Sequence, residues 1–306
     1  MADLFPGFAE HTVETAGAPV HLRVGGRGPP VLLLHGYPQT LAIWHRMAPA
    51  LAKGFTVVAA DLRGYGDSGK PPTTDDHAPY SKREMARDVV LAMEALGFGS
   101  FHLVGHDRGG RVGHRLAVDH PGRVRSLTVL DIAPTLAMYE RTDLEFARAY
   151  YHWFFLIQPA PLPERLIGAE PEFFLRDKLR AWSQGRWPFD DAAFAEYLRC
   201  FRDPRTIHCS CEDYRAAASI DLVHDRADRE AGRRIRCPVL ALWGDRGVVH
   251  RCFRPLDEWR RVSDAEVSGR ALPSGHFLPE EVPGDVLRAL LPFLGRDAAP
   301  GAPGSA

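Results

Sequence analysis

The fold can be predicted from one short segment, Val104-Gly105-His106-Asp107-Arg108-Gly109-Gly110. A short apolar run at 101–104 precedes it and indicates a buried strand. The apolar spacing of 111–120 indicates a helix that ends before Pro121. A strand, a Gly-x-Asp-x-Gly turn and a helix together predict a tight elbow in which glycines make room for the backbone. Asp107 is therefore expected to stand above the edge of a sheet.

Asp107 occupies the position at which such an elbow often carries a serine nucleophile. A carboxylate needs no base to deprotonate it, so it can attack at neutral pH. It is suited to displacement at an sp³ carbon that bears a leaving group. The elbow therefore predicts an ester between Asp107 and an alkyl group, formed when an epoxide opens or a halide leaves. An esterase is disfavoured, because neither Ser nor Cys occupies this position.

The composition is that of a soluble globular protein: 306 residues, 45% of them hydrophobic, with a net charge of −1. This charge gives no electrostatic footprint for nucleic acid or an anionic membrane surface. No run approaches 18 apolar residues, so no membrane span is expected, and the first residues lack the features of a secretory signal. Five scattered cysteines, an odd number, indicate reduced thiols and hence a cytoplasmic protein.

Two further patterns resemble binding motifs but lack the context that such motifs need. The segment 64–70 nearly matches a dinucleotide fingerprint and a P-loop, yet Pro71 and Pro72 follow where a helix should begin. His208-Cys209-Ser210-Cys211 lacks a second ligand pair at the spacing of zinc sites. We therefore expect neither a bound nucleotide nor a metal ion.

Apolar runs and helical periods alternate over most of the chain, which predicts an α/β fold. The expected strands are an opening hairpin over 8–25 and runs at 31–34, 56–60, 101–104, 124–130, 238–245 and 266–272. The expected helices are 41–52, 81–96, 111–120, 251–260 and 284–294. Such alternation favours a mostly parallel sheet with helices on both faces, whose ligands bind at the carboxyl ends of the strands.

The segment 135–225 has a different pattern, because it is helical, rich in aromatic residues and without a strand-like run. We interpret it as a helical cap inserted into the sheet domain. The expected organisation is a first part of the α/β core at 1–134, the cap at 135–225, a second part of the core at 226–297, and a disordered tail at 298–306.

Loops at the predicted strand ends supply a nucleophile, an acid and a histidine in the order typical of this fold. His276, after the last strand, is the expected general base that activates water against the Asp107 ester. Asp131 and Asp245 each end a strand, and either could orient the histidine. The other would then be a surface or turn carboxylate.

Arg108 and Arg111 indicate the substrate, because they lie three residues apart at the start of the elbow helix and share a face near Asp107. Two guanidiniums beside the nucleophile could bind a small carboxylate, although either could instead pair with a structural acid. Arg115, one turn further on, is expected at the surface. The backbone N–H groups of Tyr37 and Arg108 are expected to form an oxyanion hole.

These features resemble the fluoroacetate (haloacetate) dehalogenase family of the α/β-hydrolases, a superfamily in which epoxide hydrolases and haloalkane dehalogenases also use an aspartate nucleophile. The resemblance covers roughly 5–295, and its most specific motif is Gly-His-Asp-Arg-Gly-Gly-Arg at 105–111. Epoxide hydrolases usually carry Trp where this chain has Arg108. His35-Gly36-Tyr37-Pro38-Gln39-Thr40 matches the family's strand-end motif, with Tyr where Phe is common.

The resemblance implies an α/β-hydrolase fold with an inserted cap, and a reaction that converts haloacetates to glycolate and halide. Fluoroacetate is an implied substrate, as are chloroacetate and bromoacetate; no cofactor is implied, and the family is typically homodimeric. It favours Asp131 over Asp245, a second acid that the family does not need. The residues that it assigns are Asp107, His276 and Asp131 as nucleophile, base and acid, Arg108 and Arg111 for the carboxylate, and His152, Trp153 and Tyr214 for the halide.

Two other functions remain open. An epoxide hydrolase would use two cap tyrosines, and Tyr214 could pair with Tyr150 or Tyr151. It would not need the two arginines of the elbow helix. A non-catalytic binding protein of the same fold is the second alternative, but such proteins often lose the nucleophile or the histidine, and both are present here.

Overall fold

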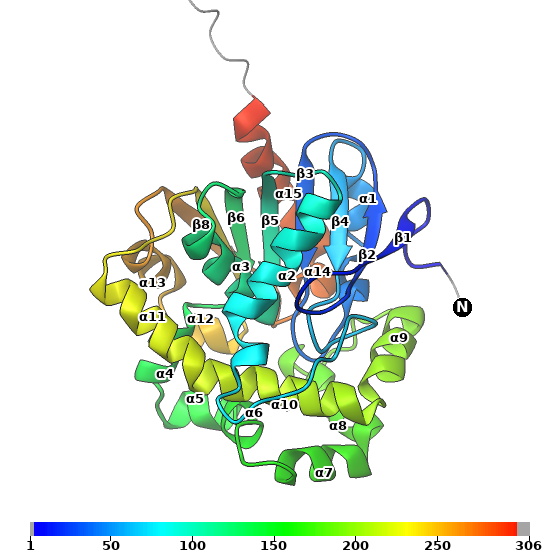
Figure 1. Ribbon diagram of the computed structural model, residues 1–306, viewed down its shortest axis with the longest axis vertical. Helices are drawn as coiled ribbons and strands as arrows, with labels where there is room; N and C mark the ends of the chain where they lie inside the picture. Colours follow the sequence, from blue (N-terminus) through cyan, green and yellow to red (C-terminus); the bar gives the residue numbers. More distant parts are fainter. Residues whose placement is uncertain (1–2, 299–306) are drawn as a thin grey trace, which may run out of the picture.

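The computed structural model describes residues 3–298 and places eight strands in one sheet of order β1-β2-β4-β3-β5-β6-β7-β8 (Figure 1). The pairs β1–β2 and β2–β4 are antiparallel, and all later pairs are parallel. The tail expected at 298–306 lies outside the described residues beyond Ala298. The strands are β1 Ala9–Val13, β2 Val20–Gly25, β3 Pro30–Leu34, β4 Thr56–Ala60, β5 Phe101–His106, β6 Val124–Leu130, β7 Val239–Gly244 and β8 Val267–Leu272.

Helices cover both faces of the sheet, which explains why the central strands are apolar on both sides. In β3, Leu32 packs with α2 and α3 on one face, whereas Leu33 packs with α1 and α15 on the other. The core helices are α1 Ala48–Leu51, α2 Lys82–Ala95, α3 Arg108–Asp119, α12 Val248–Cys252, α13 Pro255–Arg261, α14 Leu278–Glu281 and α15 Pro283–Leu294, with short 3₁₀ helices η1 Leu41–Trp44, η2 Ala78–Tyr80 and η3 Gly295–Ala298.

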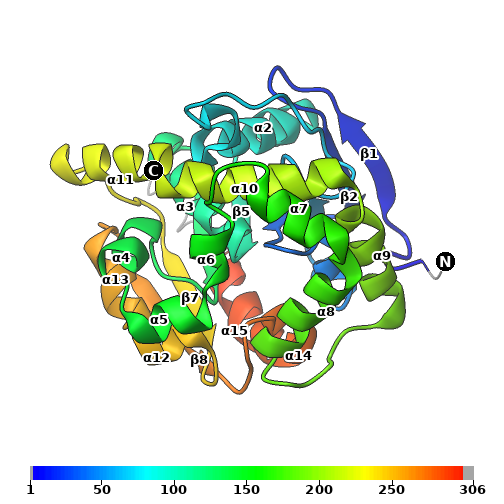
Figure 2. The same cartoon turned by 90° about the horizontal axis from the view of Figure 1, so that it is seen from below.

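Eight helices follow β6 before the chain returns to the sheet at β7. Seen from below in Figure 2, α6, α7, α8 and α10 lie across the end of the molecule at which β5 runs into α3. They are α4 Thr135–Glu140, α5 Leu144–Ala149, α6 His152–Phe155, α7 Leu162–Ala169, α8 Pro171–Trp182, α9 Asp191–Phe201, α10 Pro204–Ala218 and α11 Ile220–Glu230. The last of them ends five residues beyond the expected boundary at 225.

Two helices expected from the sequence are broken in the structure. The segment 41–52 forms η1 and α1, and the segment 251–260 is divided between α12 and α13. The second break has a local cause, because Arg254 precedes Pro255 and adopts φ −111° and ψ 82°, outside the helical region. The elbow helix begins at Arg108, three residues earlier than its apolar period indicates.

Between residues 3 and 298, no helix is both long and apolar enough to cross a bilayer.

Candidate active site

The elbow between β5 and α3 places Asp107 at the carboxyl end of the central strand. Asp107 has φ 46° and ψ −114°, a backbone conformation that few residues with side chains adopt, and it is 5% exposed. A β-carbon on Gly105 would collide with the backbone of Gly110, and one on Gly109 with the carbonyl of Leu34. The elbow therefore requires glycine at both positions, as the motif predicts.

The carboxylate of Asp107 is held in its ionised form. The backbone N–H of Tyr37 donates a hydrogen bond to its Oδ1 at 3.0 Å. Burial raises the pKa of Asp107, but the charges of His276, Arg108 and Arg111 outweigh it and lower the pKa below its ordinary value. A buried carboxylate that remains charged at neutral pH can act as a nucleophile without a general base.

His276 lies on the loop between β8 and α14, and its Nδ1 is 2.6 Å from Oδ2 of Asp131. The other carboxylate oxygen of Asp131 accepts the N–H of Gly244 at 2.9 Å. Burial lowers the pKa of His276, but its hydrogen bond to Asp131 and the negative charges nearby raise it above 6.5. With Nδ1 hydrogen-bonded to Asp131, Nε2 of the ring is available to a water molecule.

Asp245 stands apart from this pair, although it also follows a strand. Its side chain is 44% exposed and lies 3.9 Å from Arg246. Of the two acids that the sequence left open, the structure therefore places Asp131 beside His276 and Asp245 in an exposed turn.

Arg108 is fully buried and forms an ion pair that the sequence analysis did not identify. Its Nε donates to Oδ2 of Asp213 at 2.9 Å, and its Nη2 donates to Oδ1 at 2.7 Å. Arg108 thus pairs with a structural acid, which was one of the two alternatives considered for the arginines of the elbow helix. Its Nη1 nevertheless has no hydrogen-bond partner within residues 3–298 and remains available to a ligand. As the first residue of α3, Arg108 also has a backbone N–H without a partner inside the helix.

Arg111 is held by neutral groups. Its Nη1 donates to the carbonyl of Ala133 at 3.2 Å and to Oγ1 of Thr135 at 3.0 Å, and its Nη2 lies 3.2 Å from the sulfur of Met138. Its Nε has no partner in the described part of the chain. Burial and the charge of Arg108 lower the pKa of Arg111, although Asp107 opposes this. A buried guanidinium surrounded mostly by neutral groups can accommodate an anionic ligand.

The side chains expected to bind a halide are buried together. The rings of His152 and Tyr214 lie 5.5 Å apart, and those of Trp153 and Tyr214 lie 6.3 Å apart. Burial lowers the pKa of His152 well below 6.5 and raises that of Tyr214, so both are neutral. Among residues 3–298, no hydrogen-bond partner is found for Nδ1 of His152, Nε1 of Trp153 or the hydroxyl of Tyr214. Buried polar atoms usually have a hydrogen-bond partner, so a cluster of donors without one suits a polar ligand.

Arg108 and Arg111 on the elbow helix contact two of the aromatic rings that carry these donors. The guanidinium carbon of Arg108 lies 4.2 Å from the ring centre of Tyr214, and that of Arg111 lies 4.7 Å from the ring centre of Trp153. The ring of Tyr37 lies 5.3 Å from that of Tyr214. The expected carboxylate and halide donors therefore form one contiguous buried group around Asp107.

A cavity of about 270 Å³ is lined by His276. Its lining also includes Tyr150 and Trp182 from the inserted helices, and Gly247 and Arg251 from the segment after β7. The hydroxyl of Tyr150 also lies 3.3 Å from Nδ1 of His276. Tyr151, the other tyrosine considered for an epoxide hydrolase, is 45% exposed.

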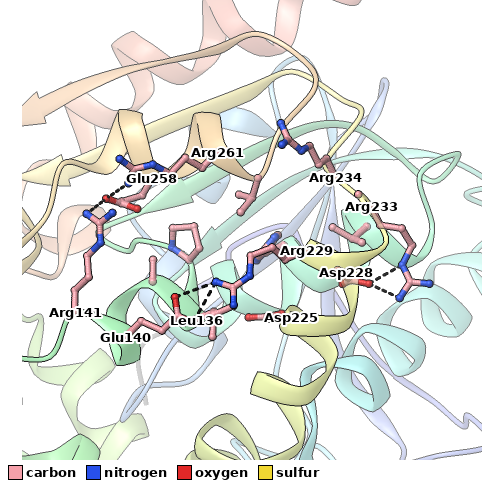
Figure 3. Close-up of a pocket in the computed structure, with 16 residues that line it drawn as sticks. Leu136, Glu140, Arg141, Asp225, Asp228, Arg229, Arg233, Arg234, Glu258 and Arg261 are labelled. Atoms are coloured by element: carbon pink, nitrogen blue, oxygen red, sulfur yellow. Dashed lines mark hydrogen bonds and ion pairs between the residues drawn. The ribbon is translucent and has the colours of Figure 1, made fainter.

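A second pocket of about 270 Å³ lies between α4, α11 and α13, and its charged side chains bind one another (Figure 3). Arg141 and Arg261 pair with Glu258, while Arg229 pairs with Glu140. Arg233 pairs with Asp228, a residue that also binds Arg115. The acids of this pocket therefore already neutralise most of its arginines.

The pairing of Arg115 corrects one expectation. We expected Arg115 at the surface, but its side chain is 4% exposed and pairs with Asp228 and with Asp119. The expectation was wrong because α11 packs over this face of α3. No local pattern in the sequence predicts that contact.

The motif at 208–211 has ordinary partners in the structure. Nδ1 of His208 lies 3.1 Å from Glu164, and the thiol of Cys209 lies 2.9 Å from the hydroxyl of Tyr80. Within residues 3–298, no group of three His, Cys, Asp or Glu side chains is arranged to hold a metal ion.

The strand order and the elbow define the class of protein as an α/β-hydrolase, and comparison with known proteins agrees. Residues 29–249 match the model of the alpha/beta hydrolase fold family. A structure of an alpha/beta hydrolase from Nostoc sp PCC 7120 is 55% identical with a TM-score of 0.93, and the match covers 95% of this chain and 99% of that one.

Relatives of known activity indicate which family of α/β-hydrolases the chain belongs to. The chain is 48% identical to a fluoroacetate dehalogenase of Burkholderia sp over 293 residues, which is 95% of both chains. It is 33% identical to a soluble epoxide hydrolase of Corynebacterium sp. (strain C12), over 93% of this chain and 96% of that one. The chain belongs to the haloacetate dehalogenase family, which is one family of the α/β-hydrolases. It is therefore a hydrolase that acts on carbon–halide bonds.

Proposed function

We propose that the protein converts haloacetates, fluoroacetate included, to glycolate and halide through an ester on Asp107. The observation that carries this proposal is the group of buried donors around Asp107 that lack partners within residues 3–298. Two of them are guanidinium groups and three belong to neutral side chains. A haloacetate offers a carboxylate to the first set and a leaving halide to the second. The donor atoms are Arg108 Nη1, Arg111 Nε, His152 Nδ1, Trp153 Nε1 and the hydroxyl of Tyr214.

The first chemical step is a displacement at the carbon that bears the halogen. Arg108 and Arg111 hold the substrate carboxylate, which places this carbon in front of Asp107. A carboxylate oxygen of Asp107 forms the new C–O bond as the C–X bond breaks, and the halide leaves with the electron pair. Attack in line with the leaving group inverts the configuration of a 2-substituted haloacid.

The departing halide is stabilised by hydrogen bonds. Fluoride is a poor leaving group, so the donors of His152, Trp153 and Tyr214 have to stabilise the charge that develops on it. Because these donors are buried and fixed by packing, they need no reorganisation when the bond breaks.

The second step is hydrolysis of the ester. His276, oriented by Asp131, removes a proton from water, and the resulting hydroxide attacks the carboxyl carbon of Asp107. The N–H groups of Tyr37 and Arg108 stabilise the oxyanion. The ester bond then breaks, glycolate takes the proton, and the aspartate is regenerated.

Halide release from fluoroacetate, chloroacetate and bromoacetate, measured beside diol formation from styrene oxide, tests the proposed function. We expect release from all three acids. Chloride or bromide alone would leave the haloacid reaction standing and contradict the fluoride pocket. Diol formation without halide release would favour an epoxide hydrolase, in which Tyr150 and Tyr214 would bind the epoxide oxygen.

We also propose that the protein is cytoplasmic, as its scattered cysteines indicate, and that it is a homodimer, as its family resemblance implies. All five cysteines are free thiols, which suits a reducing compartment. Three large apolar side chains on neighbouring cap helices are exposed and could lie in a subunit interface: Leu162 and Leu166 on α7 and Phe173 on α8. Light scattering after size exclusion should give twice the chain mass of 34.0 kDa, and the monomer mass would contradict the dimer.

A further inference from the structure

Asp213 on α10 is a fully buried carboxylate that the proposed reaction does not use. It binds two of the three guanidinium nitrogens of Arg108 through its carboxylate, at 2.9 and 2.7 Å. Its backbone carbonyl also accepts from Nη2 of Arg108, at 3.0 Å. These contacts fix the plane and the direction of the guanidinium and leave Nη1 as its free end.

The core of the molecule holds Asp213 in turn. The ammonium of Lys82 on α2 forms an ion pair with Oδ1, and the hydroxyl of Tyr65 donates to Oδ2 at 2.7 Å. Burial raises the pKa of Asp213, but the charges of Arg108 and Lys82 hold it below its ordinary value. Asp213 is therefore an ionised group fixed by two cations and a hydroxyl.

Asp213 lies beside residues that would bind both ends of the proposed substrate. Its neighbour Tyr214 carries one of the proposed halide donors, and the ring of Tyr214 covers a face of the Arg108 guanidinium at 4.2 Å. One turn of α10 thus fixes a group that would bind the carboxylate and a group that would bind the halide. Both groups would contact the same two-carbon acid, so their separation determines how well that acid is bound.

We propose that Asp213 is a positioning residue for carboxylate recognition: it directs Nη1 of Arg108 at the substrate carboxylate and sets its separation from the hydroxyl of Tyr214. The inference rests on the proposed function, because it takes the substrate to be a small haloacid. A role limited to stability makes a different prediction, namely a lower melting temperature with unchanged binding of carboxylates.

The test is the Asp213→Asn variant of the full chain, studied by steady-state kinetics with chloroacetate and by calorimetric binding of acetate. An asparagine can accept from only one of the two nitrogens and carries no charge. We expect KM for chloroacetate and Kd for acetate each to rise about tenfold or more, and kcat to change much less. This is the pattern for an interaction that stabilises the bound substrate and the transition state equally. An unchanged KM and Kd would overturn the proposal.

Asp221→Asn is the matched control. Asp221 is also buried on the cap side, accepts the backbone N–H of Lys82 at 2.9 Å and lies 3.6 Å from its ammonium. Within residues 3–298, it makes no hydrogen bond to Arg108. We expect its KM and its acetate Kd to stay within about twofold of the wild-type values. A rise as large as that of Asp213→Asn would assign the effect to charge around Lys82 and overturn the proposal.

A milder variant keeps the proposal testable if Asp213→Asn does not fold. Tyr65→Phe removes only the hydroxyl that donates to Asp213 and keeps the ring. We expect its KM and acetate Kd to rise by about threefold with the fold intact, as for the loss of one hydrogen bond that orients a charged group. Wild-type values for both would overturn the proposal.

The acetate measurement separates this inference from the proposed function. A wild-type protein that binds acetate but releases no halide would refute the dehalogenase proposal, and the Asp213 variants would still be judged by their acetate Kd. A wild-type protein that binds no acetate would overturn the inference itself.

Discussion

Asp131 and Asp245 both end strands, but only the packing of the loops decides which of them reaches His276. The hydrogen bond from His276 to Asp131 is 2.6 Å, while the side chain of Asp245 is 44% exposed. Asp131→Asn should therefore lower kcat by roughly 10³-fold or more, as in triads that lose their acid. Asp245→Asn should leave kcat within about twofold. A larger loss in Asp245→Asn, measured as glycolate formation, would reverse the assignment.

In the proposed mechanism, the same pair should set the pH dependence of ester hydrolysis. Asp131 raises the pKa of His276 above 6.5, and the imidazole must be neutral to accept a proton. The rate of hydrolysis should therefore rise with pH until His276 has lost its proton, with an apparent pKa above 6.5. Single-turnover rates over pH 5 to 9 measure this pKa, and a rate that is flat below 6.5 would exclude His276 as the base.

The hydroxyl of Tyr214 is one of the donors in the proposed fluoride pocket, and its removal tests that role. Tyr214→Phe keeps the ring that packs on Arg108 and removes the hydroxyl, which has no partner within residues 3–298. Turnover of fluoroacetate should fall by about 10²-fold, the usual cost of removing one donor from a developing charge. Bromide needs less assistance, so turnover of bromoacetate should fall far less. Equal losses for the two acids would contradict a halide-binding role.

At the scale of elements, the elbow depends on the close approach of α3 to β3. A β-carbon on Gly109 would meet the carbonyls of Leu34 and His35, whereas one on Gly168 in α7 would meet no heavy atom within 4 Å. Gly109→Ala should therefore destabilise the protein by about 1–3 kcal/mol and displace Asp107. Gly168→Ala should be neutral or stabilising by up to about 1 kcal/mol. Urea denaturation measures both, and equal effects would contradict this account of the elbow.

Elements were predictable from the sequence where a local pattern determines them. Strands β3, β4 and β7 are almost entirely buried, so each is a nearly continuous apolar run that marks its own position. The break between α12 and α13 was missed, although Pro255 gave a signal for it. The break between η1 and α1 was missed as well, although Pro49 in the first turn of α1 gave a signal for it.

At the scale of the whole molecule, contacts between cap and core were not predictable from local patterns. Arg108 and Asp213 are 105 residues apart, and no spacing rule connects them. Asp213 does precede Tyr214 in the segment that the family resemblance identified, so its position was visible but its partner was not. The burial of Arg115 beneath α11 has the same origin.

A buried acid between cap and core should make stability depend on pH. Glu280 of α14 accepts the hydroxyl of Tyr197 from α9, and burial raises the pKa of Glu280 to about 8. The folded protein keeps the proton of Glu280 up to about pH 8, whereas the unfolded chain releases it near pH 4.5. The protonated side chain therefore stabilises the fold fully below pH 4.5, and this contribution is lost as pH rises through 8.

Glu280→Gln mimics the protonated acid at every pH. The variant should match the wild type at pH 4.5 and exceed its free energy of unfolding by at least about 1 kcal/mol at pH 9. Chemical denaturation at the two pH values measures the difference. A constant difference between the two proteins would show that Glu280 does not titrate over this interval.

The proposed mechanism depends on an ester at Asp107, and mass spectrometry of the His276→Asn variant can detect it. Without the base, the first step should proceed and the second should stall. After incubation with chloroacetate, the peptide that contains Asp107 should therefore carry one carboxymethyl group, and the same peptide from an Asp107→Asn/His276→Asn control should carry none. An unmodified Asp107 in a His276→Asn variant that still releases halide at the wild-type rate would contradict the mechanism.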